Sequence, residues 1–259
     1  MAVSGTGPLI HPEPDRIVLA GDWDANISRA CAVVQYAGAR SISTVVQLGD
    51  FGVAAGGPWL TRFLDTLESA CDHYAVTVFF VDGNHEHFPS LAGLPVDAGT
   101  GARTVRPHIY HLPRGLRWRW HDNTWMALGG AHSVDRPDRK EGVSWWPEEH
   151  LTTQQVRDAI ASGPVDVMVC HDAPAGVLIP GLSSTGFPAA EIATADRHRD
   201  LLATVVDATS PALLFHGHYH IRYRGIRGNT TIIGLADDSA PLAENILVLN
   251  LTEHLPMRQ

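Results

Sequence analysis

Five short apolar runs in the sequence each end in aspartate, asparagine or histidine. Runs that are rich in β-branched residues and stop at glycine are typical of buried strands, and ligands of α/β folds gather at the carboxyl ends of such strands. The side chains that follow the five runs are therefore predicted to meet. They belong to Gly21-Asp22-Trp23-Asp24, Gly49-Asp50, Gly83-Asn84-His85-Glu86, His171-Asp172 and Gly217-His218-Tyr219-His220.

The chemistry that fits this set is metal-dependent hydrolysis. A single aspartate or histidine after a strand is usually a cap, a turn or a core residue, but five in succession favour a joint site. A site for two cations needs one carboxylate that bridges them, further oxygen and nitrogen ligands, and open positions for water and substrate. Asp50 is the candidate for the bridging ligand. Mixed imidazole and carboxylate ligands suit manganese, iron, nickel or zinc, and the lack of thiolates argues against a structural zinc site.

The elements that must position these residues can be read from hydrophobic periodicity. Strands are expected at residues 17–20, 45–48 and 78–81, separated by helices whose apolar residues recur at helical spacing. This βαβαβ order predicts a parallel sheet with right-handed crossovers, which places the first three polar clusters along one sheet edge. The apolar stripes of the two helices are Ile27, Ala30, Cys31 and Val34, and Leu60, Phe63, Leu64 and Leu67.

The rest of the chain is expected to build a second sheet. Residues 88–106 are predicted to be a loop, residues 116–120 and 124–128 a hairpin, and Thr152 the start of a helix with a capping box. Strands at 167–170 and 213–215 flank a long helix, and residues 222–224, 230–233 and 246–249 are predicted to form an antiparallel meander. We expect one domain over residues 1–259, with a loose arm at 1–15 and a loop and hairpin region at 88–150 beside the site.

Composition excludes some classes of protein. Of 259 residues 44% are apolar and 18% charged, which is typical of a globular protein, and the net charge of -9 argues against a partner as polyanionic as long nucleic acid. The three cysteines are scattered and are expected to be reduced core thiols. No signal-peptide pattern or membrane-length apolar run occurs, so we expect a cytoplasmic protein without a membrane partner.

The order of these elements resembles the signature of the calcineurin-like metallophosphoesterases. That signature reads Asp-x-His, Gly-Asp, Gly-Asn-His-Asp/Glu, a single histidine after a strand, and Gly-His-x-His, and it is matched here between residues 22 and 220. The resemblance implies an α/β fold, a four-layer αββα sandwich of two mixed sheets, with two divalent metals at the strand ends. By position, the first metal would be held by Asp22, Asp24, Asp50 and His220, and the second by Asp50, Asn84, His171 and His218.

Two positions within the signature are of special interest. His85 matches the histidine that in the family contacts the phosphate and protonates the leaving group, although a structural role beside Asn84 is the alternative. Asp24 departs from the family, because a histidine is expected there. A carboxylate at this position could still bind the first metal, giving a site with more negative charge, or it could leave that site weak. Manganese is the first expectation for the metals, with iron, nickel, zinc or magnesium as alternatives.

Residues 129–148 offer further candidates for contact with the substrate. His132, Arg136 and Arg139 could each hold a phosphate oxygen if the hairpin region packs beside the site, although surface arginines are more often solvated. The pair Trp145-Trp146 could stack on a nucleobase, but packing in the core or in a lid is the commoner role of such residues.

The function predicted from these observations is hydrolysis of small soluble phosphoesters, by a phosphodiesterase or phosphatase acting on substrates such as cyclic nucleotides. A protein serine/threonine phosphatase is the alternative within the family. Against it, Gly49-Asp50 is followed by Phe51 and not by the arginine that grips the phosphoryl group in those enzymes. A nuclease is disfavoured by the missing basic surface. An alternative of another class is a metal-stabilised binding or scaffold protein with weakened catalysis. The oligomeric state is left open.

Overall fold

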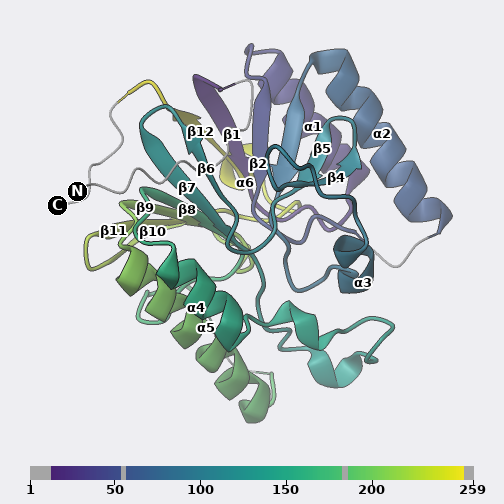
Figure 1. The fold of residues 1–259 in the computed structure, drawn as a ribbon. Coiled ribbons are helices and arrows are strands. Elements are labelled where there is room, and N and C mark those ends of the chain that lie inside the picture. The colour runs from purple at the N-terminus through teal and green to yellow at the C-terminus, as the bar shows by residue number, and fades with distance from the viewer. Residues whose placement is uncertain (1–12, 54–56, 183–185, 254–259) are drawn as a thin grey trace.

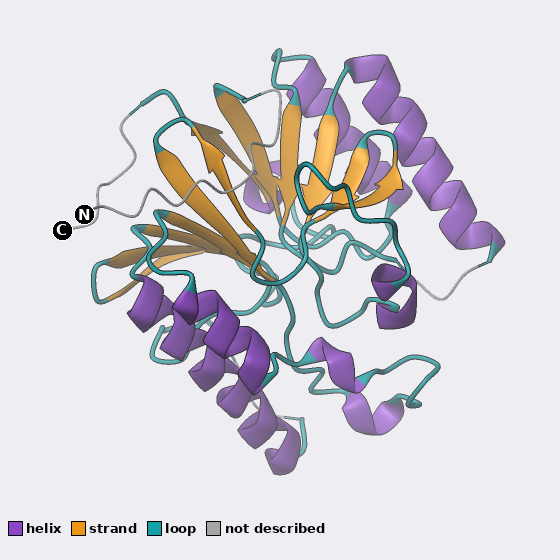
Figure 2. Cartoon of the chain, viewed as in Figure 1, coloured by secondary structure: helices purple, strands orange, loops and turns teal. Residues whose placement is uncertain are grey.

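Two six-stranded mixed sheets pack face to face in the computed structural model, which describes residues 13–53, 57–182 and 186–253 (Figure 1). Helices cover the outer face of each sheet, so the molecule has four layers in the order helix, sheet, sheet, helix (Figure 2). The predicted αββα sandwich is confirmed. Most of the expected N-terminal arm, residues 1–12, lies outside the described residues.

The first sheet contains the predicted βαβαβ unit. Strands β1, β2, β3 and β5 are parallel, and β12 and β4 pair antiparallel at the two edges. Helices α1 and α2 are the crossovers, as predicted. In sheet order the strands are β12 (Ile246–Asn250), β1 (Arg16–Ala20), β2 (Thr44–Gln47), β3 (Thr77–Phe80), β5 (Ile109–His111) and β4 (Arg103–Arg106); the helices are α1 (Ile27–Gly38), α2 (Pro58–Tyr74), α3 (Phe88–Ala92) and α6 (Leu242–Asn245).

The second sheet is built from the later half of the chain. The predicted hairpin of β6 and β7 is confirmed, and helix α4 begins with the predicted capping box, in which Thr152 and Gln155 bond each other's backbone. In sheet order the strands are β10 (Tyr223–Arg227), β11 (Thr230–Gly234), β9 (Leu213–His216), β8 (Val167–Cys170), β7 (Asn123–Leu128) and β6 (Arg117–Trp120); the helices are α4 (Thr153–Ala161), α5 (Ala189–Thr209) and the short turns η1 (Arg136–Asp138) and η2 (Pro147–Glu149).

A shared apolar layer between the sheets fixes their relative position. Leu19 and Val46 of the first sheet belong to the same buried cluster as Trp118, Trp120 and Trp125 of the second. The three tryptophan rings lie with centroids 5.3–5.8 Å apart and are fully buried. Because large aromatic side chains contribute much of the apolar area that a core removes from water, this cluster anchors one sheet against the other.

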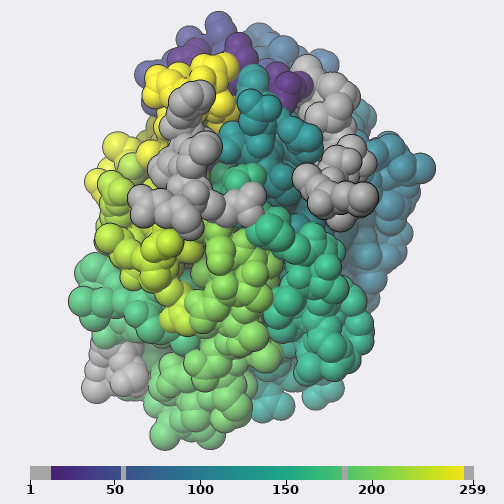
Figure 3. Space-filling view, turned by 60° about the vertical axis from the view of Figure 1, so that its left-hand side comes forward, coloured from purple at the N-terminus to yellow at the C-terminus, as the bar shows by residue number. Residues whose placement is uncertain are grey.

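Two predictions about the strands and helices are wrong. Residues 88–106 are not all loop, since they contain α3 and β4. The predicted closing meander is also incorrect: β10 and β11 form a hairpin, but β12 crosses to the other sheet and pairs antiparallel with β1, from Arg16↔Asn250 to Ala20↔Ile246. Figure 3 accordingly shows the yellow C-terminal segment beside the purple N-terminal residues. Alternating apolar residues indicate a strand, but they do not name its partner.

Within the described part of the chain, no helix has the length and apolar character that crossing a bilayer requires.

Candidate metal centre

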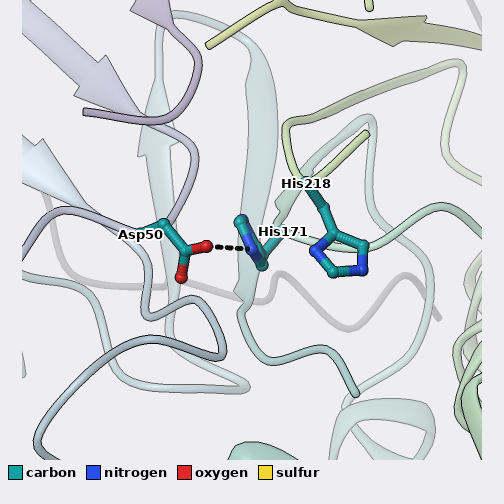
Figure 4. A group of neighbouring side chains, drawn as sticks. All are labelled: Asp50, His171 and His218. Atoms are coloured by element: carbon teal, nitrogen blue, oxygen red, sulfur yellow. Dashed lines mark ion pairs between the residues drawn. The ribbon is translucent and has the colours of Figure 1, made fainter. Parts of the chain in front are cut away.

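The predicted ligands converge where the two sheets meet. The loops after β1, β2 and β3 approach from the first sheet, and the loops after β8 and β9 approach from the second. Figure 4 shows the Asp50 carboxylate directed at the ring of His171, with His218 beside it. The ligand atoms of these three residues all lie within 4.8 Å of one another.

The hydrogen bonds of His171 leave one ring nitrogen free for a cation. Its Nδ1 donates to the carbonyl of Leu48 at 2.8 Å, so the proton of the neutral ring sits on Nδ1. Nε2 then carries a lone pair, yet it lies 3.3 Å from Asp50 Oδ2 and 3.1 Å from Asn84 Oδ1, which are also electron donors. Three lone-pair atoms that face one point fit a bound divalent cation. With His218 they make four candidate ligands: two imidazoles, one carboxylate and one amide.

The shifted pKa values of the candidate ligands also favour a bound cation. Burial lowers the pKa of His171, but the charges of Asp50 and Asp22 outweigh it and raise that pKa to about 10. Without a metal, a proton therefore occupies Nε2, in the place that a cation would take. Burial raises the pKa of Asp50, but the charges of His171 and His85 and their hydrogen bonds hold it well below its usual value. Desolvation lowers the pKa of His218 to about 3, which keeps its ring neutral. A buried place that attracts positive charge this strongly suits a metal ion.

The first predicted site is built around Asp22. Its carboxylate is fully buried and accepts the backbone N–H of His218 at 3.0 Å, and its Oδ2 lies 3.2 Å from His220 Nε2. The other ring nitrogen of His220, Nδ1, lies 3.2 Å from the carboxylate of Asp237, in the loop after β11. A carboxylate behind a histidine orients the ring, so Asp237 directs Nε2 of His220 toward Asp22.

Asp24 lies at the rim of this first site. Its side chain is exposed, and its backbone N–H donates to the carbonyl of Asp50 at 2.8 Å. Partial desolvation, followed by the charges of Asp50 and Asp22, raises the pKa of Asp24 to about 7. Asp24 therefore lies close enough to interact electrostatically with both candidate ligands. Its carboxylate adds negative charge where the family signature has an imidazole.

The glycines of the motifs allow the loops to approach so closely. A Cβ on Gly83 would lie 2.0 Å from Asp50 Oδ1, and a Cβ on Gly217 would lie 2.0 Å from Asp22 Oδ1. Real atoms do not approach to that distance. Each glycine thus sits where one loop touches the carboxylate of another, which explains why glycine precedes Asn84 and His218 in the sequence.

We expect Gly83→Ala to weaken metal binding because its Cβ would push the Asp50 carboxylate out of position. Changes to groups that orient a metal ligand cost about 10- to 100-fold in metal affinity, and we expect a loss of at least that size. Metal titration of the purified variant measures it. The matched control is Gly93→Ala, at the end of α3, where the added Cβ would lie 3.5 Å from its nearest neighbour. Equal metal affinity of the two variants would contradict this role of Gly83.

Two buried polar side chains hold the Asp50 loop in shape. Glu86 accepts the backbone N–H groups of Phe51 at 2.6 Å and Val53 at 2.7 Å. Burial, and next the charge of Asp50, raises the pKa of Glu86 to about 8. Gln47 donates to the carbonyls of Gly21 and Gly49, and so connects the loops after β1 and β2. These bonds stabilise the positive φ of 52° at Asp50, a backbone conformation that aspartate seldom adopts.

His85 lies beside the candidate metal ligands, with its side chain exposed at the cavity. Its backbone N–H donates to Asp50 Oδ1 at 2.8 Å, while its ring lies against Arg139, whose Nη2 is 2.6 Å from Nδ1 and 3.0 Å from Nε2. Arg139 is itself held by Asp135, to which its Nε donates at 2.8 Å. The structure therefore brings Arg139, one of the three predicted substrate contacts, to the imidazole that is the candidate proton donor.

A cavity of about 440 Å³ opens over these residues. Asp50, Asn84, His85, His218 and His220 form its floor, and one wall is apolar. The other lining residues come from η1 and its approach, from the segment before α5, from α5 itself and from the loop after β9: Val134, Asp135, Leu182, Phe187, Ile192, Ala195, Asp196, Arg199 and Tyr219. A cavity of this volume accommodates a ligand the size of a nucleotide.

The structure does not bring His132 or Arg136 to this cavity. His132 is 1% exposed, and its ring nitrogens lie within hydrogen-bond distance of His150 and Glu191. The guanidinium of Arg136 stacks on the ring of Trp145 at 4.4 Å.

Trp145 and Trp146 are buried, and Trp146 contacts His87 edge-on, so the pair has the packing role.

Several residues of the site escaped sequence analysis in whole or in part. The sequence identifies Glu86 as the last residue of the Gly-Asn-His-Asp/Glu motif, but not its hydrogen bonds to the Asp50 loop. Asp237 follows a strand end, as the other site aspartates do, and that placement was a signal that could have found it. Arg199 and Asp196 lie on a face of α5 whose sequence shows no pattern that distinguishes a cavity wall from a surface.

Comparison with known proteins gives a consistent result. Residues 15–222 match the family model described as calcineurin-like phosphoesterase. The fold is similar to that of TT1561 from Thermus thermophilus, with 12% identity, 92% of this chain and 99% of that chain covered, and a TM-score of 0.57. It is also similar to a dimetal phosphatase from Danio rerio, with 17% identity, 93% and 94% coverage and a TM-score of 0.56.

A third structure with a similar fold is GAP50. GAP50, described as the anchor in the inner membrane complex of Plasmodium, is 12% identical, with 85% of this chain and 71% of that chain covered and a TM-score of 0.50. At such identities the likeness concerns the fold alone. Comparison with curated protein sequences gives no match.

Proposed function

The chain belongs to the calcineurin-like phosphoesterase family, and from this premise we propose that it hydrolyses small phosphodiesters with the help of two divalent metal ions. The observation that carries the proposal is the set of donors around His171 Nε2, with oxygens of Asp50 and Asn84 at 3.3 and 3.1 Å, on the floor of a cavity of nucleotide size. Asp22, Asp24, Asp50 and His220 would hold one ion, and Asp50, Asn84, His171 and His218 the other.

The residues around the ions have separate roles in the proposed reaction. Bound divalent cations would supply Lewis-acid polarisation of the phosphoester and a lowered pKa for the attacking water. His85 lies at the cavity and is the candidate general acid, giving its proton to the oxygen that leaves as the phosphorus–oxygen bond breaks. Arg139, in contact with the His85 ring, is placed to hold that ring and to offer its remaining N–H groups to a phosphoryl oxygen.

The charges of the cavity favour a diester over a monoester. Apart from the proposed metal ligands, the described residues of its lining include two carboxylates, Asp135 and Asp196, and one arginine, Arg199. A phosphodiester carries one negative charge and a phosphomonoester carries up to two near neutral pH, so the monoester meets more repulsion from the same walls. The apolar wall at Leu182, Phe187 and Ile192 suits a substrate whose second substituent is apolar or aromatic, such as a nucleobase.

Comparing two chromogenic substrates tests this proposal. The metal-loaded protein should hydrolyse bis-p-nitrophenyl phosphate with a higher kcat/KM than p-nitrophenyl phosphate, and a chelator should abolish both activities. Manganese, nickel, zinc, iron and magnesium should each be tried. Faster hydrolysis of the monoester would contradict the diester preference while leaving a phosphoesterase in place.

Absence of turnover with every metal would instead favour the alternative of another class, a metal-stabilised scaffold. GAP50 is a fold relative that is described as an anchor, and the unusual Asp24 is the feature of this chain that supports such a loss of catalysis. A protein phosphatase is the weaker alternative, because Phe51, not an arginine, follows Asp50, and Phe51 is fully buried. Turnover of phosphopeptides faster than of bis-p-nitrophenyl phosphate would favour it.

We expect Asp24→Ala to weaken the first metal selectively, because a carboxylate near Asp22 and Asp50 adds attraction for a hard cation. Asp24→His should shift the preference from manganese toward zinc, which accepts imidazole more readily. Metal content and activity of both variants across manganese, nickel, zinc and magnesium measure the effect. The second metal should be unaffected, since His171 and His218 are unchanged. If Asp24→Ala keeps full occupancy and the same preference, Asp24 is not a ligand.

A further inference from the structure

A second cluster of metal-ligating side chains lies outside the site described above. His132 follows β7, and Glu149 and His150 lie at the end of η2. His132 Nδ1 is 2.7 Å from His150 Nε2 and 3.3 Å from Glu149 Oε1, and His150 Nε2 is 3.5 Å from the same oxygen. Ligands about 2.0–2.1 Å from a tetrahedral zinc ion lie about 3.3 Å from one another, which two edges of the triangle match. The third edge, between the two histidines, is a hydrogen bond that a bound ion would have to open.

The contact with Glu191 determines which ring nitrogen of His132 carries the lone pair. Nε2 lies 2.8 Å from Glu191 Oε2, at the start of α5, and its N–H donates a hydrogen bond to that carboxylate. The neutral ring then has its lone pair on Nδ1, directed at Glu149 and His150. A carboxylate behind a histidine in this way is the usual support of a metal-bound imidazole, because it fixes the tautomer and the ring orientation.

Hydrogen bonds leave two electron-donor atoms of this cluster close together. Glu149 Oε1 accepts the backbone N–H of Ser133 at 3.0 Å, and a proton on His150 Nε2 can serve His132 Nδ1, but Glu149 Oε1 still lies 3.3 Å from His132 Nδ1, a second electron donor. Glu149 is 0% exposed and His132 1% exposed. Buried electron donors that face one another are costly unless a proton or a cation lies between them.

We propose that His132, Glu149 and His150 bind a third divalent transition-metal ion, with zinc the best match to two imidazoles and one carboxylate. The side chain of His150 is 29% exposed, which provides an entry path and an open coordination position. None of the three residues belongs to the predicted ligand sets of the two catalytic metals, so this site is separate from them.

The third ion would act on the catalytic centre through two hydrogen bonds. Ser133 Oγ donates to Glu149 Oε2 at 2.6 Å and accepts from Asn84 Nδ2 at 3.0 Å. The Ser133–Asn84 bond orients the amide of Asn84 so that its Oδ1 faces His171. A cation that fixes Glu149 therefore also fixes Ser133 and the direction in which Asn84 presents its oxygen.

Zinc content in an Asp50→Asn background tests the proposal without relying on turnover. Asp50→Asn removes the shared ligand of the catalytic metals, so zinc that remains after dialysis reports on other sites. We expect Asp50→Asn to retain one zinc per chain at the third site and the double variant Asp50→Asn/His150→Ala to lose it. The control is Asp50→Asn/His73→Ala, which removes an exposed histidine of α2 and should keep the ion.

A thermal shift gives a second measurement. Zinc should raise the Tm of Asp50→Asn and of the His73 control, and it should leave the Tm of the His150 variant unchanged, because only an ion bound to the folded state stabilises it. His150→Asn replaces His150→Ala if the alanine variant does not fold. Equal zinc content in Asp50→Asn and Asp50→Asn/His150→Ala would overturn the proposal and leave a hydrogen-bonded chain from His150 through His132 to Glu191. The hydrolytic function would be untouched by that result.

Discussion

Asp50→Asn should lower kcat/KM by about a thousandfold or more and should empty both catalytic metal positions. Metal ions contribute several kcal/mol of transition-state stabilisation, and each 1.36 kcal/mol is a factor of ten in rate. The asparagine keeps an oxygen for the bond that Asp50 Oδ1 accepts from His85 N–H. Its NH₂ group can point at His171 Nε2, where Asp50 Oδ2 now lies 3.3 Å away, and can satisfy that lone pair without a cation. The fold should therefore survive while the metals are lost.

Metal analysis and kinetics with bis-p-nitrophenyl phosphate measure both effects of this variant. The matched control is Asp65→Asn, the same substitution at an exposed carboxylate of α2 that pairs with Arg106 at the surface. That change should leave metal content and kcat/KM as they are, since exposed ion pairs contribute little to stability. If Asp50→Asn retains two metals and most of its activity, Asp50 does not bridge them.

His85→Ala should reduce kcat by a factor of about 100 to 10,000, the usual contribution of a positioned general acid, and should leave the metal content unchanged. The side chain of His85 faces the cavity and Arg139, and only its backbone N–H contacts Asp50. The backbone bond survives in the alanine variant. The loss should therefore appear in the chemical step and not in metal affinity, which distinguishes this variant from Asp50→Asn.

Arg139→Ala provides the comparison for His85. If Arg139 acts by holding the His85 ring, the double variant His85→Ala/Arg139→Ala should be no slower than His85→Ala, because residues in contact are not additive. Additive losses would show that Arg139 contacts the substrate independently. Loss of metal from His85→Ala comparable with that from Asp50→Asn would show that His85 is a ligand and not a proton donor.

The sequence by itself determined which residues could meet at the candidate metal centre. Val45, Val46 and Val78 lie in buried strands, and glycine with aspartate or asparagine follows within four residues of each strand's end. Those features are local, because apolar periodicity reports burial and a polar residue at a strand end reports the sheet edge. Parallel pairing of β1, β2 and β3 then brings Asp22, Asp50 and Asn84 together, as the βαβαβ order predicted.

Only the tertiary structure decided which loops of the two sheets touch. The His218 amide bonds to Asp22 across 196 residues, and His132 faces Glu191 across 59. The same packing pairs β12 with β1 and buries His132 away from the cavity over His85. Periodicity carries no information about such distances along the chain, since a buried polar residue looks the same whether its partner is a substrate, a metal or another side chain. The partners follow from how the apolar layer around Trp118 and Trp125 sets one sheet against the other.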